Sequence, residues 1–211
     1  MKKLVIASTN PGKLRELEQM LSPLGIKLIA QSQLGIPEAA EPHATFVENA
    51  LAKARHASTR ARLPALADDS GICAAALNGA PGVRSARYAG ASCASIDRDS
   101  QDARNNRKLI AALARTHDRR AHYYCVIVLV RCPDDPEPLI AEGRWEGEVI
   151  TEPRGSNGFG YDPYFYLPAF GRTAAELDAT EKNAVSHRGQ ALQQLVVRLA
   201  AELAWLQTTN R

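Results

Sequence analysis

Two adjacent carboxylates, Asp68 and Asp69, interrupt an apolar stretch of the chain just before a Ser-Gly pair. Two negative charges ~4 Å apart at an effective dielectric constant of ~20 repel by roughly 4 kcal/mol, enough to shift one carboxyl pKa by about 3 units. A hard divalent cation relieves this repulsion, because carboxylate and phosphate oxygens are the ligands that Mg²⁺ prefers. The alternative is that residues 68–71 form only a solvated turn, for which Asp, Ser and Gly are common.

Backbone alternation bears on how these two carboxylates are used. If residues 66–69 end a strand, the side chains of Asp68 and Asp69 point to opposite faces. We then expect one carboxylate to enter a pocket and the other to brace a turn at Ser70 and Gly71, where glycine suits a sharp change of direction. The pattern does not say which aspartate takes which part.

A second candidate group is the segment Ser-Thr-Asn-Pro-Gly-Lys at residues 8–13. Asn10 suits a helix N-cap and Pro11 the first helical position, and Gly12 lets a ligand approach the backbone. Free N–H groups, the positive end of the helix dipole and Lys13 together predict an anion site, best suited to phosphate. The segment is not a Walker P-loop. A plain capped helix start is the alternative for this segment taken alone.

Two further segments carry groups that suit a purine base. The glycine-rich loop 155–163 holds Phe159, which can stack on a flat base, and Tyr161, an aromatic that is costly to leave exposed. A hairpin loop would have similar glycines but would not explain the aromatics. Residues 181–188 bring the donors of Lys182, His187 and Arg188 to one short segment, which suits a purine carbonyl or a phosphate. A helix start flanked by solvated charges is the alternative there.

Hydrophobic periodicity and turn residues predict the elements that position these groups. Strands are expected at residues 3–7, 26–30, 66–69, 72–77, 123–130 and 143–149. Helices are expected at residues 11–24, 46–60 and 97–114 and after Ser186. Thr45 and Glu48 form a capping box for the second of these helices. The polar stripe of that helix is typical of a solvated outer face and comprises Asn49, Lys53, His56 and Arg60.

Composition narrows the class of protein. The chain has 211 residues and a formal net charge of +3, with scattered basic residues, so bulk nucleic-acid binding is not indicated. The four cysteines have neither zinc-ligand spacing nor a disulfide pattern, and Cys73 and Cys125 lie in apolar runs as expected of small buried hydrophobes. The apolar run after Lys3 is too short for a signal peptide, and no run is long enough to span a membrane. These features predict a cytoplasmic protein with no membrane partner.

The order and wording of seven segments resemble one family, the inosine/xanthosine triphosphate pyrophosphatases. The segments are Ser8-x-Asn10-x-x-Lys13, Phe46-x-Glu48-Asn49-Ala50-x-x-Lys53-Ala54, Ala67-Asp68-Asp69-Ser70-Gly71, Gly79-Ala80-Pro81-Gly82, Ser85-Ala86-Arg87-Tyr88-Ala89-Gly90, Gly158-Phe159-Gly160-Tyr161-Asp162-Pro163 and Lys182-Asn183-x-x-Ser186-His187-Arg188. Each motif is weak evidence alone. The probability that seven motifs occur by chance in this order across nearly the whole chain is very small.

The resemblance implies an α/β fold: an elongated mixed β-sheet flanked by helices, with two lobes around a central substrate cleft. We therefore expect residues 1–211 to form a single pyrophosphatase domain rather than two independent ones. The implied activity is Mg²⁺-dependent hydrolysis of the purine nucleoside triphosphates ITP, dITP and XTP to a monophosphate and pyrophosphate by a homodimer. Such an enzyme removes deaminated purines from the nucleotide pool and so keeps them out of DNA and RNA.

The resemblance also implies roles for individual residues. Asp69 is expected to activate water, with Asp68 as the second candidate, and Asp69 with Glu41 is expected to hold the metal. Base selection would depend on donors such as His187 and Arg188 facing the carbonyl at position 6 of the purine. The substrate-binding residues implied are Ser8, Thr9, Asn10, Pro11, Gly12, Lys13, Lys53, Ser70, Phe159, Gly160, Tyr161, Asp162, Lys182, His187 and Arg188.

Three other functions share part of this pattern. A nucleotide-binding sensor would use the same pockets without turnover, and a phosphatase would release the γ-phosphate instead of pyrophosphate. A nucleic-acid module would use Arg119, Arg120 and the aromatics Tyr123 and Tyr124, but the chain lacks a basic stripe.

Overall fold

The structure is a computed structural model that describes residues 3–90 and 98–209 and divides into two compact units. Unit 1 comprises Met1–Asp69, Cys125–Gly143 and Arg188–Arg211, and unit 2 comprises Ser70–Tyr124 and Arg144–His187. Each unit has its own hydrophobic core. Cys93 and Asp97, which entered the sequence analysis, lie outside the described residues.

The described chain has the α/β composition that the sequence predicts. Its helices are α1 (Pro11–Leu21), α2 (Phe46–Ala61), α3 (Arg98–Leu113), α4 (Ala179–Val185) and α5 (His187–Thr209). Its strands are β1 (Lys3–Ile6), β2 (Lys27–Ala30), β3 (Ala65–Ala74), β4 (Arg120–Val130), β5 (Leu139–Val149), β6 (Phe165–Leu167) and β7 (Arg172–Thr173). These seven strands form one sheet in the order β2-β1-β3-β4-β5-β6-β7.

The sheet is mixed, as expected. β1 pairs in parallel with β2 and with β3, where Val5 lies opposite Ala65 and Ile6 opposite Leu66. The pairs β5-β6 and β6-β7 are antiparallel. Three strands, β3, β4 and β5, contribute residues to both units. The expected α/β class is therefore confirmed.

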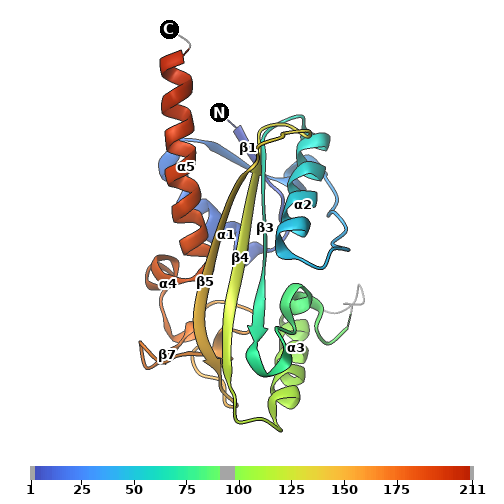
Figure 1. Ribbon diagram of the computed structural model, residues 1–211, viewed down its shortest axis with the longest axis vertical. Helices are drawn as coiled ribbons and strands as arrows, with labels where there is room; N and C mark the ends of the chain where they lie inside the picture. Colours follow the sequence, from blue (N-terminus) through green and yellow to red (C-terminus); the bar gives the residue numbers. More distant parts are fainter. Residues whose placement is uncertain (1–2, 91–97, 210–211) are drawn as a thin grey trace. The chain divides into compact units, whose positions relative to one another are not determined.

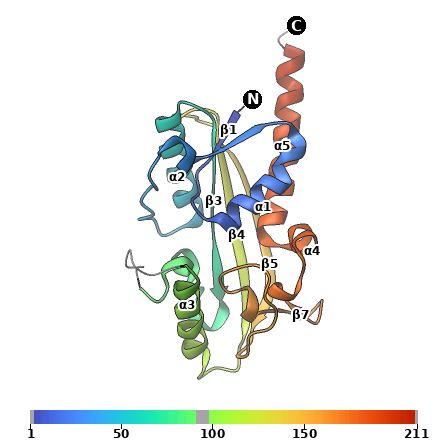
Figure 2. The same cartoon turned by 180° about the vertical axis from the view of Figure 1, so that it is seen from behind.

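Unit 1 places helices on both faces of its strands. Figures 1 and 2 show α1 and α5 on one face and α2 on the other. Leu17 and Leu21 of α1 pack with Leu192 and Leu195 of α5 in the unit 1 core. Cys125 is part of the same core, and burial raises the pKa of its thiol to about 12. This is the inert, buried cysteine that the sequence predicts.

The helix boundaries follow the predicted capping residues. Asn10 caps α1, and Pro11 occupies its first position. A short 3-10 turn follows α1, and the chain then leaves the helical path at Gly25, whose left-handed φ of 66° is accessible to glycine. Thr45 caps α2 by accepting a hydrogen bond from the Glu48 N–H at 3.3 Å. These local signals determine where α1 and α2 begin.

Unit 2 has an aromatic core. Tyr123, Trp145 and Phe165 pack together, with ring centroids 4.6 Å apart for Tyr123 and Phe165 and 5.5 Å apart for Trp145 and Phe165. Leu109 and Leu113 of α3 belong to the same cluster. Polar side chains of α3 form hydrogen bonds with residues 86–89 and with Gly160 in unit 2.

The turn predicted at Ser70 and Gly71 is wrong, and so is the separate strand predicted at residues 72–77. β3 is continuous through this region and ends at Ala74, followed by a 3-10 turn over Ala75–Leu77. Gly71 serves a close approach of backbone instead: a Cβ there would lie 2.3 Å from the Gly82 carbonyl oxygen and 2.5 Å from Ser85 Oγ. The Ser85 hydroxyl accepts a hydrogen bond from the Ile72 N–H at 3.0 Å, so a side chain at residue 71 would disrupt this contact.

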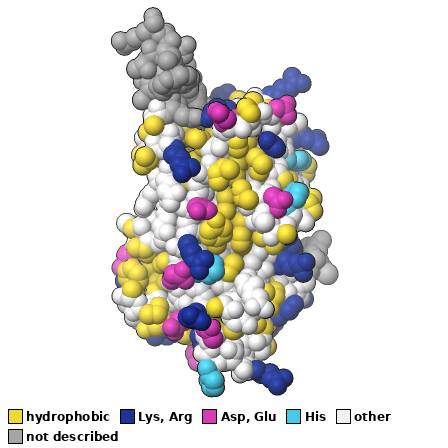
Figure 3. Space-filling view, in the orientation of Figure 1, with side chains coloured by type: hydrophobic (Ala, Val, Ile, Leu, Met, Phe, Trp, Pro, Cys, Tyr) yellow, Lys and Arg dark blue, Asp and Glu magenta, His cyan; other side chains and the backbone are white. Residues whose placement is uncertain are grey.

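The face of the molecule in Figure 3 carries Lys and Arg side chains interspersed with Asp and Glu. None of the helices in the described part of the chain combines the length and the apolar composition that crossing a membrane requires.

Candidate active site

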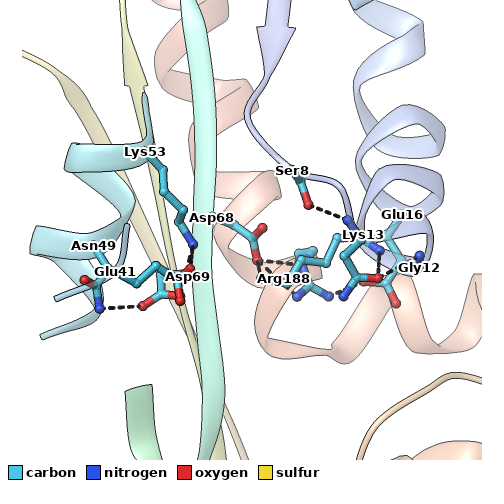
Figure 4. Close-up of polar contacts among 11 residues, drawn as sticks. Ser8, Gly12, Lys13, Glu16, Glu41, Asn49, Lys53, Asp68, Asp69 and Arg188 are labelled. Atoms are coloured by element: carbon cyan, nitrogen blue, oxygen red, sulfur yellow. Dashed lines mark hydrogen bonds and ion pairs between the residues drawn. The ribbon is translucent and has the colours of Figure 1, made fainter. Parts of the chain in front are cut away.

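The two adjacent aspartates point to opposite faces of β3, as strand alternation predicts. Figure 4 shows Asp69 directed toward α2 and Asp68 directed toward α1 and α5. Both side chains are buried, and both have cationic partners within unit 1. The solvated-turn alternative is therefore wrong, and the two carboxylates have different environments.

Asp69 shares an ammonium group with a second carboxylate. Lys53 Nζ lies 3.1 Å from Asp69 Oδ1 and 2.8 Å from Glu41 Oε1. Glu41 comes from the loop before α2, and Lys53 comes from the second turn of α2. The structure therefore brings together three residues that the sequence analysis assigned to metal and substrate binding (Figure 4).

Asn49 holds this arrangement from the buried side of α2. Its amide accepts a hydrogen bond from the His43 N–H at 3.1 Å and donates to the His43 carbonyl at 3.2 Å. It also donates to Asp69 Oδ2 at 3.3 Å. Asn49 thus fixes the loop that carries Glu41 and orients Asp69 at the same time. The prediction that Asn49 and Lys53 lie on a solvated stripe is wrong, because this face of α2 covers β3.

The pKa values around Asp69 are displaced upwards. Burial is the main cause of the raised pKa of Asp69, opposed by the positive charge of Lys53 and reinforced by the negative charge of Glu41. Burial lowers the pKa of Lys53, but the charges of Asp69, Asp68 and Glu41 outweigh it and raise that pKa. Asp69 is therefore the more basic of the two aspartates, which suits a group that accepts a proton from water.

Asp68 has the opposite character. Its Oδ2 lies 2.9 Å from Lys13 Nζ and 3.1 Å from Arg188 Nη2. Burial raises its pKa, but the charges of Lys13, Arg188 and Lys53 outweigh burial and hold the pKa far below the usual range. Asp68 stays ionised and engaged, so it orients Lys13 and is a poor proton acceptor. The bracing role predicted for one aspartate falls to Asp68, with cations rather than a turn as its partners.

The start of α1 differs from the predicted cradle of free N–H groups. Asn10 Oδ1 accepts from the Gly12 N–H at 2.9 Å and from the Lys13 N–H at 3.4 Å. The Leu14 N–H donates to the Asn10 carbonyl, and Pro11 has no N–H to offer. The first-turn donors are thus already used within the helix. Phosphate binding here would depend on the Lys13 ammonium, the Ser8 hydroxyl and the helix dipole.

The remaining residues of this segment are also engaged locally. The Ser8 hydroxyl accepts from the Asn10 N–H at 3.2 Å, and the Thr9 hydroxyl donates to the Glu38 carboxylate. Ser70, which the sequence predicts to bind substrate, lies on β3 directly after Asp69 and is the first residue of unit 2.

The loop at residues 158–162 of unit 2 is organised around Asp162. This buried carboxylate accepts from the Phe159 N–H at 2.9 Å and from the Tyr123 hydroxyl at 3.2 Å. Lys182 Nζ lies 2.7 Å from Asp162 Oδ2 and 4.9 Å from the centroid of the Phe159 ring. Asp162 therefore holds the Lys182 ammonium beside the Phe159 ring, and its own oxygens are occupied by groups of the chain.

Two glycines and one tyrosine complete this loop. Gly158 has a φ of 76°, and a Cβ there would lie 2.1 Å from Asp162 Oδ2. Gly160 also has a positive φ, of 66°. The Tyr161 hydroxyl donates to the Ser85 carbonyl at 2.8 Å. Three residues predicted to bind substrate, Phe159, Asp162 and Lys182, thus belong to one hydrogen-bonded group, whereas Tyr161 bonds to Ser85.

The donors predicted to read the base edge do not all lie in one unit. His187 belongs to unit 2, where its ring stacks on Tyr123 at 4.5 Å with an interplanar angle of 6°. Arg188, the next residue, belongs to unit 1 and pairs with Asp68 and with the Glu16 carboxylate. Both side chains are almost completely buried. The role of Arg188 in reading a base stays a prediction.

Sequence reasoning missed several residues of these two groups. Glu16 follows Lys13 by three residues and so shares its face of α1, a spacing that could have paired it with a cation. Tyr123 and Trp145 are part of the alternating apolar pattern of their strands. That pattern predicts that the rings are buried, but it does not predict whether they contact a loop or the core. The burial of Asn49 could have been predicted more closely, because the Thr45 cap fixes where α2 begins and therefore which residues share each face of the helix.

The carboxylates of Glu41 and Asp69 fit a hard divalent cation. Both contact the same ammonium group, so they already converge on one positive charge. Within residues 3–90 and 98–209 no group of three or more His, Cys, Asp or Glu side chains could hold a metal ion. Two protein carboxylates completed by substrate phosphates and water is the arrangement typical of Mg²⁺.

Comparison with known proteins places the whole arrangement in a family. A protein from Ralstonia nicotianae named dITP/XTP pyrophosphatase is 65% identical over 199 residues, which cover 94% of this chain and 97% of the relative. A protein of the same name from Nitrosomonas europaea is 61% identical over 95% of each chain. The solved structure of a HAM1 protein from Coxiella burnetii matches with a TM-score of 0.86 and 53% identity, covering 95% of this chain and all of that one. The model of the Ham1 family matches residues 4–198, and this chain belongs to that family.

Proposed function

We propose that this protein hydrolyses the α–β phosphoanhydride of deaminated purine nucleoside triphosphates, dITP, ITP and XTP, to the monophosphate and pyrophosphate. The observation that carries the proposal is the Lys53 ammonium held by both Glu41 and Asp69, two carboxylates that converge on one positive charge. The names of the relatives from Ralstonia nicotianae and Nitrosomonas europaea support the choice of substrate.

In the proposed reaction, water attacks the α-phosphorus and Asp69 accepts its proton. A P–O bond to the water oxygen forms as the bridging α–β P–O bond breaks, which gives the monophosphate, and pyrophosphate leaves. Asp68 is the poorer proton acceptor of the two aspartates, because the charges of Lys13 and Arg188 hold its pKa far below the usual range. Lys13 neutralises phosphate charge and is itself oriented by Asp68. Lys53, which contacts Glu41 and Asp69 in this structure, would add positive charge for the phosphates.

Glu41 and Asp69 would hold Mg²⁺ as cofactor. The ion would supply neutralisation of the charge that develops on the phosphate oxygens. This assignment is tested by titrating Mg²⁺ into wild-type protein and into Glu41→Gln, with pyrophosphate release as one readout and calorimetric Mg²⁺ binding as the other. We expect Glu41→Gln to weaken Mg²⁺ binding, and unchanged binding would remove Glu41 from the site.

Unit 2 would bind the purine. Phe159 offers a ring face for stacking, and the Lys182 ammonium beside it offers a donor to a base carbonyl. Hypoxanthine and xanthine have a carbonyl at position 6, where adenine has an amino group. A site built from donors leaves adenine unpaired, which is how a site rejects an analogue.

Product identification tests the proposal. The protein is incubated with ITP, dITP, XTP, GTP and ATP in the presence of Mg²⁺, and the products are separated by ion exchange. We expect pyrophosphate with IMP, dIMP or XMP, and slower turnover of GTP and ATP. Orthophosphate with IDP would identify a γ-phosphatase, and tight binding without products would identify a sensor.

Assembly and location belong to the same proposal. The family resemblance supports a homodimer in the cytoplasm, and light scattering coupled to gel filtration measures the assembly directly. A mass of about one chain in that experiment, independent of protein concentration, would contradict the dimer.

A further inference from the structure

The loop at residues 158–162 is held from behind by helix α3. Asp102 and Asn106 lie four residues apart and so share one face of this helix. The Gly160 N–H donates to Asp102 Oδ2 at 2.9 Å, and Asn106 Nδ2 donates to the Gly160 carbonyl, also at 2.9 Å. Both backbone groups of one glycine are therefore bound by two side chains of α3.

These contacts have the features of a built support. Asn106 is 5% exposed, and its Nδ2 also donates to the Asp102 carbonyl at 2.9 Å, which fixes its amide relative to Asp102. The bond to Asp102 is charge-assisted, so it is stronger than a bond between neutral groups. Gly160 has a φ of 66° and nothing within 4 Å of a Cβ placed there. Local crowding therefore does not hold Gly160, whereas the two hydrogen bonds to α3 do.

The rest of α3 supports a different segment, which provides a natural comparison. Asn105 accepts from the Ala89 N–H at 2.8 Å and donates to the Ala86 carbonyl at 3.1 Å. Asn105 is as well buried as Asn106, and apart from the Gln101 amide, which donates to it at 3.0 Å, its partners lie at residues 86–89. Adjacent asparagines thus serve separate segments.

We propose that Asp102 and Asn106 are positioning residues for purine recognition, because they fix the Gly160 peptide and with it the direction of the neighbouring Phe159 ring. This rests on the proposed function, in which Phe159 stacks on the base. Asp102 and Asn106 belong to unit 2, whereas Lys13 and Lys53, which the proposed function assigns to the phosphates, belong to unit 1. Loss of the hydrogen bonds from Asp102 and Asn106 to Gly160 should therefore weaken binding of the base and leave binding of pyrophosphate unchanged.

The test uses the full-length variants Asp102→Ala, Asn106→Ala and, as matched control, Asn105→Ala. Calorimetry measures binding of two probes, IMP and inorganic pyrophosphate, and steady-state assays measure kcat and KM for ITP. For Asp102→Ala and Asn106→Ala we expect IMP affinity to fall roughly fivefold or more and KM to rise in parallel. We expect kcat and pyrophosphate affinity to stay within about twofold.

A conservative variant separates positioning from folding. Asp102→Asn keeps an acceptor oxygen for the Gly160 N–H, so we expect it to recover most of the IMP affinity lost in Asp102→Ala. Equal damage from Asn105→Ala, a parallel fall in pyrophosphate affinity, or no recovery in Asp102→Asn would each overturn the proposal. Failure of the proposed function is seen separately, as absence of pyrophosphate release from ITP by the wild-type protein.

Discussion

At the scale of single residues, two neighbouring carboxylates are made chemically different by the faces they occupy. Asp69 is buried beside Lys53 and Glu41 and has a raised pKa, whereas Asp68 is held ionised by Lys13 and Arg188. Pairs of titratable groups whose environments push their pKa values apart commonly divide the acid and base roles of a site. This difference assigns the two aspartates to separate tasks.

The first prediction concerns Asp69→Asn. This variant keeps the shape of the side chain but cannot accept a proton, so we expect kcat to fall by roughly a hundredfold or more. Pyrophosphate release measures kcat, and calorimetry with IMP should give an affinity close to that of the wild type. A variant that retains full turnover would exclude Asp69 as the base.

Asp68→Asn is the matched control for that variant. It leaves Lys13 and Arg188 without their shared anion in the core of unit 1, and such a loss costs roughly 3 kcal/mol of unfolding free energy. We expect lower thermal stability and a higher KM, with a smaller effect on kcat than Asp69→Asn. The reverse order of the two kcat effects would exchange the assigned roles.

At the scale of elements, short segments are held by carboxylates that accept backbone N–H groups. Asp135 does this in the β4-β5 connection, where it accepts from the N–H groups of Arg131 at 2.8 Å and Glu137 at 3.0 Å. Asp162 does the same for the Phe159 N–H in unit 2. In both segments, the conformation of the backbone depends on a carboxylate that accepts hydrogen bonds from it.

The connection between β4 and β5 gives a prediction about pH. Burial raises the pKa of Asp135, but hydrogen bonds from the Arg131 and Glu137 N–H groups and the charge of Arg131 outweigh it, so the pKa is lowered. A lowered folded-state pKa contributes stability above the unfolded pKa of about 4, and this contribution is lost as pH falls below it. We expect Asp135→Asn to be less stable than the wild type by roughly 1 to 2 kcal/mol at pH 7.

Denaturant unfolding at pH 7 and at pH 3 measures this effect. The difference between Asp135→Asn and the wild type should shrink at pH 3, since the Asp135 carboxyl of the unfolded wild type is then largely protonated. A difference of equal size at both pH values would show that the charge of Asp135 contributes nothing.

The loop at residues 158–162 gives a third prediction. Gly158→Ala places a Cβ 2.1 Å from Asp162 Oδ2 in addition to straining the backbone at a φ of 76°. The Asp162 carboxylate must shift, and Phe159 and Lys182 depend on it, so we expect KM for ITP to rise roughly tenfold.

Gly171→Ala is the control for that variant. Gly171 has a φ of 64° and nothing within 4 Å of the added Cβ, so it carries the backbone strain without the collision. We expect a loss of about 1 kcal/mol in stability and an unchanged KM. Equal KM values for the two variants would show that the contact with Asp162 does not matter for substrate binding.

At the scale of the whole molecule, the groups suited to phosphate and the groups suited to a base belong to different units. Lys13, Lys53 and Asp69 lie in unit 1, whereas Phe159 and Lys182 lie in unit 2. The proposed function therefore divides between the units, with chemistry in the first and recognition in the second.

The fourth prediction follows from this division. Phe159→Ala removes the proposed stacking surface, and base stacking on an aromatic ring contributes about 1 to 3 kcal/mol. We expect calorimetry to show weaker IMP binding and unchanged binding of inorganic pyrophosphate. Lys13→Ala should weaken binding of pyrophosphate, because the proposed function has Lys13 neutralise phosphate charge. Parallel losses for both probes in both variants would contradict the division of roles.

Local signals alone predicted much of the framework. Asn10 and Thr45 begin α1 and α2 as expected, because a side-chain cap acts on the N–H groups of its own helix. Alternation along β3 separates Asp68 from Asp69, because it is a property of any extended backbone. The residue types and their order also predicted the family, which the comparisons confirm.

Only the tertiary structure decided how these groups are used. Asn49 is buried against Asp69 because α2 packs that face on β3, and His187 and Arg188 go to different units because the boundary falls between them. Within β3, position 71 requires glycine because the Gly82 carbonyl and Ser85 lie against it. Sequence determines what each residue can donate, accept or neutralise. The partner that it meets depends on contacts between segments far apart in the chain. These contacts pair Asp68 with Lys13 and Arg188 and pair Asp69 with Lys53.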